Sequence, residues 1–275
     1  MRTSLGSVRH YEAAFGGWLE GIWRLSGTVR VRLLGRLGIE HGQLWLDGSA
    51  LPGRQGRIVL AYLALCHHPV SRADLADLVW PDTLTASWER DLSAVVSKVR
   101  AALDSIELGS LVHGAFGCYE LQLPPDARVD VEDAVRFVED AESAWRVGNR
   151  DVAVPAAATA ANLARRPFLP AERGLWVERR RDDLRATLLR ALDLLAQGLT
   201  GGPYGHDALR YANEALALDP FRETSYVQLM RLHMSQGNRA EALRAYEQCR
   251  AILAHDLGVS PSSQTEAAYR EVLGP

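Results

Sequence analysis

Residues 71–103 read SRADLADLVWPDTLTASWERDLSAVVSKVRAAL and decide the fold of the N-terminal half of the chain. Ser71 is a favoured N-cap residue, and apolar residues recur at helical spacing from there to Pro81, which predicts a short helix. A second helix follows, because its apolar residues lie 3, 4, 7 and 11 positions after Leu92. These positions are Leu92, Val95, Val96, Val99 and Leu103. Two helices joined at a Pro-marked turn predict either an ordinary helical hairpin or a helix-turn-helix.

The outward face of the second helix favours the helix-turn-helix. Polar residues occupy the positions that the apolar face leaves free: Arg90, Ser93, Ser97, Lys98 and Arg100. Arg and Lys neutralise phosphates, and Arg and Ser also donate hydrogen bonds to base edges. The alternative for Ser93 and Ser97 is that they are small surface residues selected only for fit.

The flanking segments predict a small α+β domain. Residues 29–33 alternate apolar and polar side chains, as a half-buried strand does, and residues 44–52 (LWLDGSALP) predict a further strand that ends in an Asp-Gly turn. Arg54–Cys66 is apolar enough to be the central helix. Residues 111–123 (LVHGAFGCYELQL) predict a β-hairpin with its bend at Gly114–Gly117. Strands followed by three helices and a hairpin are the order of a winged helix, and this context favours the helix-turn-helix over the ordinary helical hairpin for residues 71–103.

The predicted wing carries His113, Phe116 and Tyr119 but no Arg or Lys. His113 and Phe116 are the candidate DNA contacts of this hairpin. The simpler interpretation, which we favour at this stage, is that Phe116 and Tyr119 pack against the hairpin itself.

The C-terminal half predicts an all-α domain of tetratricopeptide-like repeats. DALR at 207–210 and EALR at 241–244 are offset by 34 residues, the period of that helix–turn–helix repeat. Gly-Asn-Arg at 148–150 recurs at 237–239, which indicates an earlier, degenerate unit that Pro155 is expected to kink or shorten. A long amphipathic helix is predicted near residues 172–199, with Glu178–Arg181 as a solvated face. Stacked repeats of this kind bury a continuous core and expose a surface for partners.

Composition places the chain among soluble proteins. It has 275 residues, of which 47% are hydrophobic and 24% charged. Three cysteines predict no disulfide framework, and no apolar run is long enough for a membrane span or a signal peptide. We therefore expect a cytoplasmic protein without membrane partners. Lys98 is the only lysine beside thirty arginines, which indicates a GC-rich source genome such as that of an actinobacterium.

Residues 27–125 carry nine basic and ten acidic side chains, a net charge of about −1. Proteins that bind phosphates usually carry a basic footprint, so strong independent DNA binding is not what this balance favours. Enzyme classes are disfavoured too, because no Walker-type loop, GxSxG, HExxH or CxxC pair occurs. His67–His68 do not suit a metal, since adjacent histidines cannot easily face one ion. We expect no catalytic residue, no metal and no cofactor.

The chain resembles the Streptomyces antibiotic regulatory protein family, in which a response-regulator-type winged helix precedes a bacterial transcriptional activator domain. The order and spacing of several short stretches carry this resemblance over residues 30–273. They are Arg32–Gly35, Arg54–Cys66, Ser71–Trp80, Asp91–Leu103, Gly117–Leu121, Ala164–Pro170, Trp176–Leu184, Gly237–Leu253 and Asp256–Pro261.

The resemblance implies a transcriptional activator of a nearby gene cluster, by analogy one for secondary metabolism. It would bind repeats in promoter DNA, contact RNA polymerase and form a homodimer. Residues 1–26 are rich in Gly and Ser and show no sustained period, so they predict a tail that is docked weakly through Trp18 and Trp23 or disordered, with an amphipathic partner helix as the alternative. The winged helix is expected at 27–125 and the activator domain at 126–275. The recognition helix would be Ala86–Leu103.

In that helix Arg90, Ser93, Ser97 and Lys98 would meet the major groove. Arg54, Arg57 and Arg100 would contact phosphates. Glu89 and Asp91 depart from this scheme, because carboxylates suit a helix N-terminus but repel phosphate. The expected protein is either a short form or a fragment of a longer regulator. The alternative hypothesis is a protein-interaction module whose winged helix binds DNA weakly or not at all.

Overall fold

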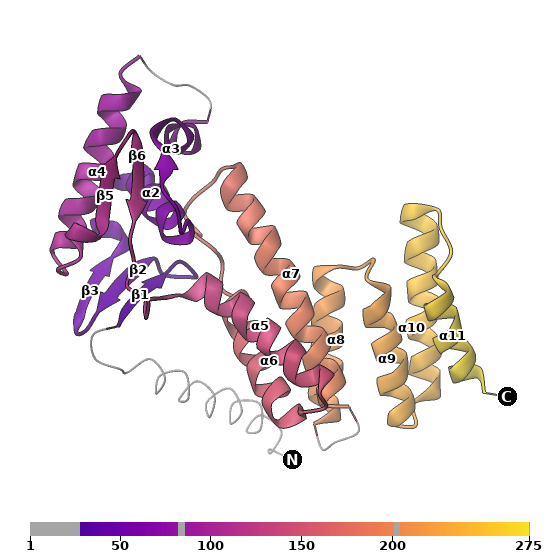
Figure 1. Cartoon of the computed structure of the whole chain (residues 1–275). Coiled ribbons are helices and arrows are strands. Elements are labelled where there is room, and N and C mark those ends of the chain that lie inside the picture. The colour runs from indigo at the N-terminus through magenta and orange to yellow at the C-terminus, as the bar shows by residue number, and fades with distance from the viewer. Residues whose placement is uncertain (1–27, 82–85, 201–203, 275) are drawn as a thin grey trace. The chain divides into compact units, whose positions relative to one another are not determined.

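A computed structural model describes residues 28–81, 86–200 and 204–274, and the predicted N-terminal tail lies outside them. The described residues form two compact units (Figure 1). One comprises 28–135 with 163–184, and we call it the winged-helix unit; the other comprises 136–162 with 185–274, and we call it the helical-repeat unit. Each unit is assembled from non-contiguous stretches, whereas the sequence predicts two continuous domains.

A four-stranded sheet opens the winged-helix unit. Its order is β3 (Leu44–Asp47), β2 (Gly38–His41), β1 (Val29–Arg32) and β7 (Arg128–Val129). The first three strands are antiparallel, with Val31 opposite Ile39, and β7 runs parallel to β1. Val29, Val31 and Leu33 are buried, as the alternation in sequence predicts.

Three helices and a second sheet complete the winged helix. The helices are α2 (Gly53–Leu65), α3 (Arg72–Val79) and α4 (Trp88–Asp104), and the sheet has the order β4 (Val70–Ser71), β6 (Cys118–Leu121), β5 (Val112–Ala115). Short 3₁₀ helices lie at Gly48–Ala50 and Gly109–Leu111. The α+β winged-helix prediction is confirmed.

The helix-turn-helix forms for the reasons that its sequence indicates. The Ser71 hydroxyl accepts a hydrogen bond of 3.0 Å from the backbone N–H of Asp74, which caps α3. All five apolar residues expected on the inner face of α4 are buried: Leu92, Val95, Val96, Val99 and Leu103. They pack with α2 and α3, whose Ile58, Leu63 and Leu75 are also fully buried.

Residues 163–184 belong to the winged-helix unit through backbone contacts. Leu34 and Phe168 form an antiparallel bridge, Gly35 N–H donates to Pro167 O at 2.8 Å, and Leu169 N–H donates to Leu33 O at 3.1 Å. Asp130 closes the same region, because its two carboxylate oxygens accept hydrogen bonds from Leu33 N–H (2.9 Å) and Leu34 N–H (3.0 Å). The loop before α7 is therefore paired with the end of β1.

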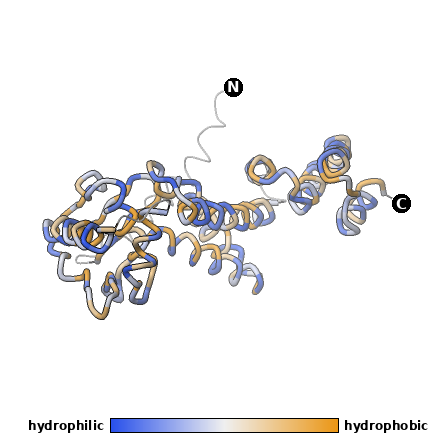
Figure 2. The backbone as a smooth tube through the Cα atoms, turned by 90° about the horizontal axis from the view of Figure 1, so that it is seen from above, coloured by the Kyte–Doolittle hydropathy of each residue, from blue (hydrophilic) through white to orange (hydrophobic). Residues whose placement is uncertain are grey.

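Helices make up the rest of the chain. They are α5 (Asp130–Arg146), α6 (Arg150–Ala164), α7 (Leu175–Gly198), α8 (Gly205–Leu218), α9 (Glu223–Ser235), α10 (Arg239–Ile252), a π-helical turn (Leu253–Leu257) and α11 (Ser263–Leu273). Helix α9 packs on α8, α10 and α11, as the 34-residue repeat predicts. Hydrophilic and hydrophobic residues alternate along these helices (Figure 2). Pro155 was expected to kink or shorten the first unit; the shortening is wrong, because α6 runs through Pro155 for 15 residues, and the kink stays a prediction.

Candidate nucleic-acid interface

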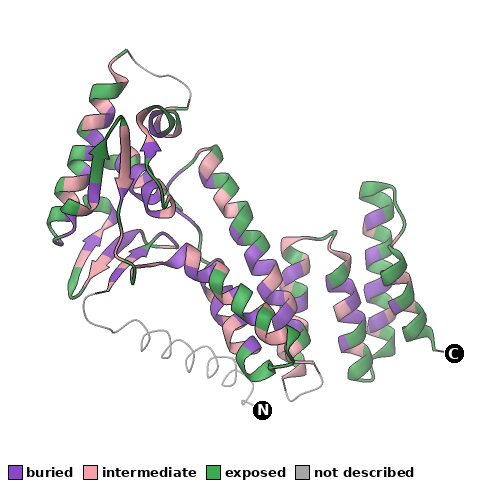
Figure 3. Cartoon of the chain, in the orientation of Figure 1, coloured by how far each residue is buried: buried purple, intermediate pink, exposed green. Residues whose placement is uncertain are grey.

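The outer face of α4 is a narrow stripe of small and basic side chains. Arg90, Ala94, Ser97, Lys98 and Ala101 are all exposed, and their spacing places them on one side of the helix. Figure 3 shows this helix exposed on one side and buried on the other. Within the described residues, no hydrogen bond or ion pair involves the side chain of Arg90 or Lys98. Two free cations separated by small residues can approach a groove closely.

Ala94 and Ala101 were missed by the sequence reasoning, which considered only polar residues of this helix. The signal that could have found them is the helical period itself, because both fall on the same face as Arg90 and Ser97. A methyl group at such a position contacts the thymine methyl in direct readout of the major groove.

Ser93 lies beside this face and is held inside the domain. Its hydroxyl donates to Glu89 O at 2.7 Å and accepts from Tyr119 Oη at 3.4 Å. It also accepts a hydrogen bond from the guanidinium of Arg72. The structure therefore gives Ser93 internal partners, and its predicted contact with DNA stays a prediction.

Arg72 connects α3 with α4 and with the tip of the wing. This role was not predicted from the sequence. Its Nη2 donates to Glu89 O at 2.8 Å and to the Ser93 hydroxyl, both on α4. Its backbone N–H donates to Gly117 O at the hairpin turn (3.0 Å), and its guanidinium lies over the Tyr119 ring at 5.7 Å. The start of α3 thus fixes the first turns of α4 and the tip of the wing to one another.

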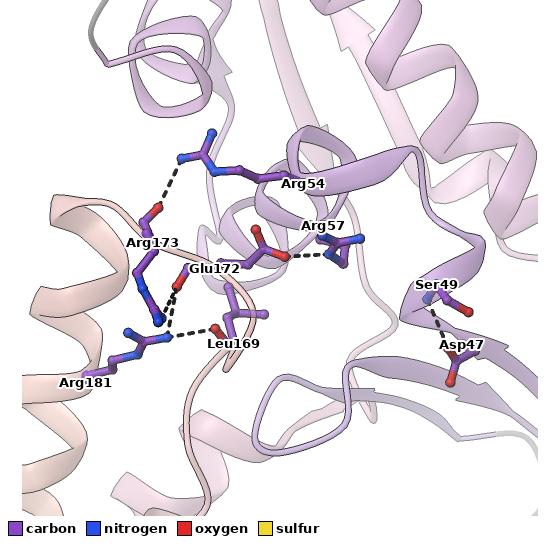
Figure 4. Close-up of polar contacts among 8 residues, drawn as sticks. All are labelled: Asp47, Ser49, Arg54, Arg57, Leu169, Glu172, Arg173 and Arg181. Carbon is purple, nitrogen blue, oxygen red and sulfur yellow. Dashed lines mark hydrogen bonds and ion pairs between the residues drawn. The ribbon is translucent and has the colours of Figure 1, made fainter.

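The three arginines expected to contact phosphates all make hydrogen bonds within the winged-helix unit. Arg100 donates from Nε and Nη2 to Val112 O at 3.2 and 3.0 Å, which joins α4 to β5. Arg54 donates to Val79 O at 3.0 Å. It also donates to Arg173 O at 3.0 Å (Figure 4). Arg57 donates from Nε to Glu172 Oε1 at 2.5 Å. Their direct contact with DNA stays a prediction, since these hydrogen bonds already give each side chain a structural role.

The loop at 168–173 is surrounded by arginine side chains (Figure 4). Arg181 donates to three of its carbonyl oxygens, those of Phe168 (3.1 Å), Leu169 (2.8 Å) and Glu172 (3.1 Å). The interpretation of residues 178–181 as a solvated face is therefore wrong for Arg181. Its partners lie 9–13 positions earlier, in a loop that helical periodicity does not describe.

The wing is a tight hairpin whose tip carries no Asp, Glu, Lys or Arg. Phe116 and Gly117 form the two-residue turn between β5 and β6 with φ of 51° and 73°, which is typical of a type I′ turn. Phe116 is 104% exposed, so the interpretation that it packs against the hairpin is wrong. His113 is exposed as well. Tyr119 is half-buried and contacts Arg72 on α3 and Ser93 on α4, so its ring lies against the helices rather than only against the hairpin.

Titratable groups of the unit serve its internal structure. Burial raises the pKa of Asp130 to about 6, although the hydrogen bonds from Leu33, Leu34 and Val131 and the charge of Arg166 oppose this shift. His67 pairs with Glu132 at 2.7 Å. Over the described ranges, no three His, Cys, Asp or Glu side chains are grouped to hold a metal ion. No described helix has the length and apolar character needed to cross a bilayer.

Comparison with known proteins decides the family. The model of the bacterial transcriptional activator domain matches residues 129–273, which is more than half of the chain. The chain belongs to the bacterial transcriptional activator domain family. The resemblance to Streptomyces antibiotic regulatory proteins is confirmed by this match and by the relatives below.

Members of this family with a similar sequence are named as regulators. The chain is 27% identical over 258 residues to the transcriptional regulatory protein MoaR1 of Mycobacterium bovis and of Mycobacterium tuberculosis, covering 90% of this chain and 80% of theirs. It is 27% identical over 252 residues to the regulatory protein AfsR of Streptomyces coelicolor, covering 90% of this chain but 24% of AfsR. The function indicated by the family and these relatives is transcriptional regulation.

A solved structure shares the fold of this family member. EmbR of Mycobacterium tuberculosis, in complex with a low-affinity phosphopeptide, superposes with a TM-score of 0.80 at 21% identity. The match covers 89% of this chain and 65% of the EmbR chain. It confirms the predicted order of a winged helix followed by a helical domain.

Proposed function

We propose that this regulator binds promoter DNA in the cytoplasm through the outer face of α4, inserted in the major groove. The observation that carries the proposal is the exposed stripe Arg90, Ala94, Ser97, Lys98 and Ala101. A B-DNA major groove is about 12 Å wide and admits an α-helix whose groove-facing side chains are short. In this stripe three of the five side chains are small, and the two long ones are cations that have no partner among the described residues.

Within this proposal the two cations have different roles. Arg90 lies in the first turn of α4, where a recognition helix contacts base edges, and its guanidinium can donate two hydrogen bonds to guanine. Lys98 lies two turns later and supplies a point charge for a phosphate. The internal hydrogen bonds of Arg54, Arg57 and Arg100 favour a positioning role for these residues beside the reading face.

The helical-repeat unit would supply the protein contacts of the same regulator. Stacked helix pairs present extended surfaces to partners, and we assign contact with RNA polymerase and homodimer formation to this unit. Sedimentation of the full chain with and without target DNA tests dimer formation. A monomer in both conditions would exclude the homodimer without affecting the DNA-binding proposal.

A gel-shift series at several salt concentrations tests DNA binding. The probes are the intergenic fragments that flank the gene, and the full chain is compared with Arg90→Ala and Lys98→Ala. Each lost phosphate contact lowers the slope of log K against log salt by about 0.9, whereas a lost base contact relaxes sequence preference. Arg244→Ala removes an exposed charge, paired only with Glu241 on the same helix, from the helical-repeat unit and serves as the control.

The alternative function is a protein-interaction module with a winged helix that no longer binds DNA. It is favoured by the net charge of about −1 over residues 27–125 and by the internal engagement of three arginines. The same gel shifts decide between the two. Binding that is equally weak for every fragment at low salt, and unchanged in Arg90→Ala and Lys98→Ala, would establish the alternative.

A further inference from the structure

The tip of the wing places a large aromatic side chain where the fold gains nothing from it. Both residues of a type I′ turn have positive φ, and Asn-Gly or Gly-Gly are the usual occupants. Phe116 adopts φ of 51°, a left-handed region that bulky residues rarely occupy because it strains the backbone. Its ring is 104% exposed and therefore contributes no packing.

The position of this ring is fixed relative to the reading face of α4. Gly117, its neighbour in the turn, accepts a 3.0 Å hydrogen bond from the backbone of Arg72. The side chain of Arg72 in turn holds Glu89 O and the Ser93 hydroxyl in the first turns of α4. Phe116 is thus joined, through one residue, to the turn that carries Arg90. The wing tip and the first turns of α4 are therefore held together, and a ligand bound at one of them lies close to the other.

The surroundings of the ring favour nucleic acid as that surface. Residues 112–119 (VHGAFGCY) contain no charged side chain, and Gly114, Ala115 and Gly117 are small, so the tip can approach a narrow groove. The other large apolar residues exposed in the described part of this unit, Leu44 and Leu175, lie on β3 and α7. A lone ring among small residues lacks the extent of a protein-docking patch.

We propose that Phe116 is an apolar wedge that enters the minor groove beside the major-groove contact and partly unstacks one base step. This inference rests on the proposed function, since it requires α4 to be bound to DNA. Apolar side chains that enter base steps in this way kink the duplex and favour flexible pyrimidine–purine steps. The wing would recognise how easily a DNA step is deformed, and an apolar side chain can do this without an Arg or Lys in the wing.

The test uses the full chain and a promoter fragment with 2-aminopurine at successive positions flanking the protected site. Wild-type protein should raise the fluorescence at one step. Phe116→Asn should abolish this increase and weaken binding about tenfold, with an unchanged salt slope because no charge is lost. Phe116→Leu keeps an apolar side chain at the tip and should retain most of the fluorescence increase and most of the affinity.

Phe116→Asn also controls for folding, because Asn suits the positive φ of this turn better than Phe does. A variant that is at least as stable as wild type and yet binds weakly cannot owe the loss to a disrupted hairpin. Equal affinity of wild type and Phe116→Asn, with no fluorescent step, would overturn the wedge while leaving the proposed function intact. A loss confined to cooperativity between two bound copies would overturn it in favour of a protein contact. If wild type binds no fragment, both proposals fail.

Discussion

The guanidinium of Arg57 donates a 2.5 Å hydrogen bond to the carboxylate of Glu172, which lies 115 positions later in the chain. Arg57 is on the central helix of the winged helix, and Glu172 is in the loop before α7 with only 2% of its side chain exposed. A residue expected to contact DNA therefore neutralises a buried carboxylate. Arg54 on the same helix binds the next residue of that loop, at Arg173 O.

Removing the cation should destabilise the winged-helix unit. Arg57→Ala leaves Glu172 buried without its partner, which costs about 3–5 kcal/mol for a fully buried pair. Arg57 is a quarter exposed, so we expect a loss of roughly 2 kcal/mol in the free energy of unfolding, measured by urea denaturation. Arg36→Ala breaks the exposed pair with Asp47, whose charges stay solvated, and should lower stability much less than Arg57→Ala does. Equal losses in the two variants would contradict a special role for Glu172.

The raised pKa of Asp130 predicts a pH dependence of stability. Its pKa is 3.8 when unperturbed and about 6 in the folded chain, so between these values the folded state binds more protons than the unfolded state. The free energy of unfolding should therefore fall as pH rises from about 4 to 6, by up to about 3 kcal/mol. Burial also raises the pKa of Asp133, which acts in the same direction.

Asp130→Asn isolates the contribution of Asp130. Asn cannot titrate and accepts from only one of the two backbone N–H groups of Leu33 and Leu34. The free energy of unfolding of wild type, minus that of this variant, should decrease from pH 4 to pH 6.5. The decrease equals the part of the pH dependence that comes from Asp130. A difference that is constant over this range would show that Asp130 does not titrate there.

Arg72 should affect DNA binding without touching DNA. Arg72→Ala removes the hydrogen bonds to Glu89 O and Ser93, so α4 and the wing lose their fixed arrangement. We expect affinity for the specific site to fall about tenfold, non-specific affinity to change little, and the salt slope to stay constant. A slope that falls by about 0.9 would show instead that Arg72 contacts a phosphate. Ser93→Ala should give part of the same loss and should be non-additive with Arg72→Ala.

The N-cap of α3 gives a prediction about local stability. Ser71→Ala removes the acceptor for Asp74 N–H and should destabilise the unit by about 1 kcal/mol, measured by thermal unfolding. Ser71→Asp, which retains a capping oxygen, should recover most of the loss. Failure of Asp to recover stability would indicate that repulsion from Asp74 outweighs the cap.

The parts of the fold that depend on local sequence were predictable. The spacing of Leu92, Val96 and Val99 placed the buried face of α4 correctly, and the 34-residue offset placed the helical repeats. The partners of Arg57 and Arg181 could not be predicted, because ion pairs and contacts with loop carbonyls leave no periodic pattern in the sequence. Arg72 was missed for a related reason: its partners come from α4 and from the wing, so its role exists only after these elements have packed.

For Phe116 the sequence led to a definite prediction, and that prediction was wrong. An aromatic residue in a hairpin is most often part of its packing, and that general preference gave the wrong answer here. A two-residue Phe-Gly turn between strands forces positive φ at the Phe, and the ring then points away from both strands. The turn length, which the sequence reasoning placed too broadly at Gly114–Gly117, is the information that was missing.

The chain passes from one compact unit to the other at residues 135, 162 and 184. A chimera of two relatives with a single crossover at 125 would separate Leu34 from its own Phe168 and Arg57 from its own Glu172. A crossover at 184 would separate the Glu142 side chain from its ion-pair partner Arg190. A double exchange, of 136–162 together with 185–274, keeps each of these three pairs within one parent. We therefore expect the double-exchange chimera to be more stable than either single-crossover chimera.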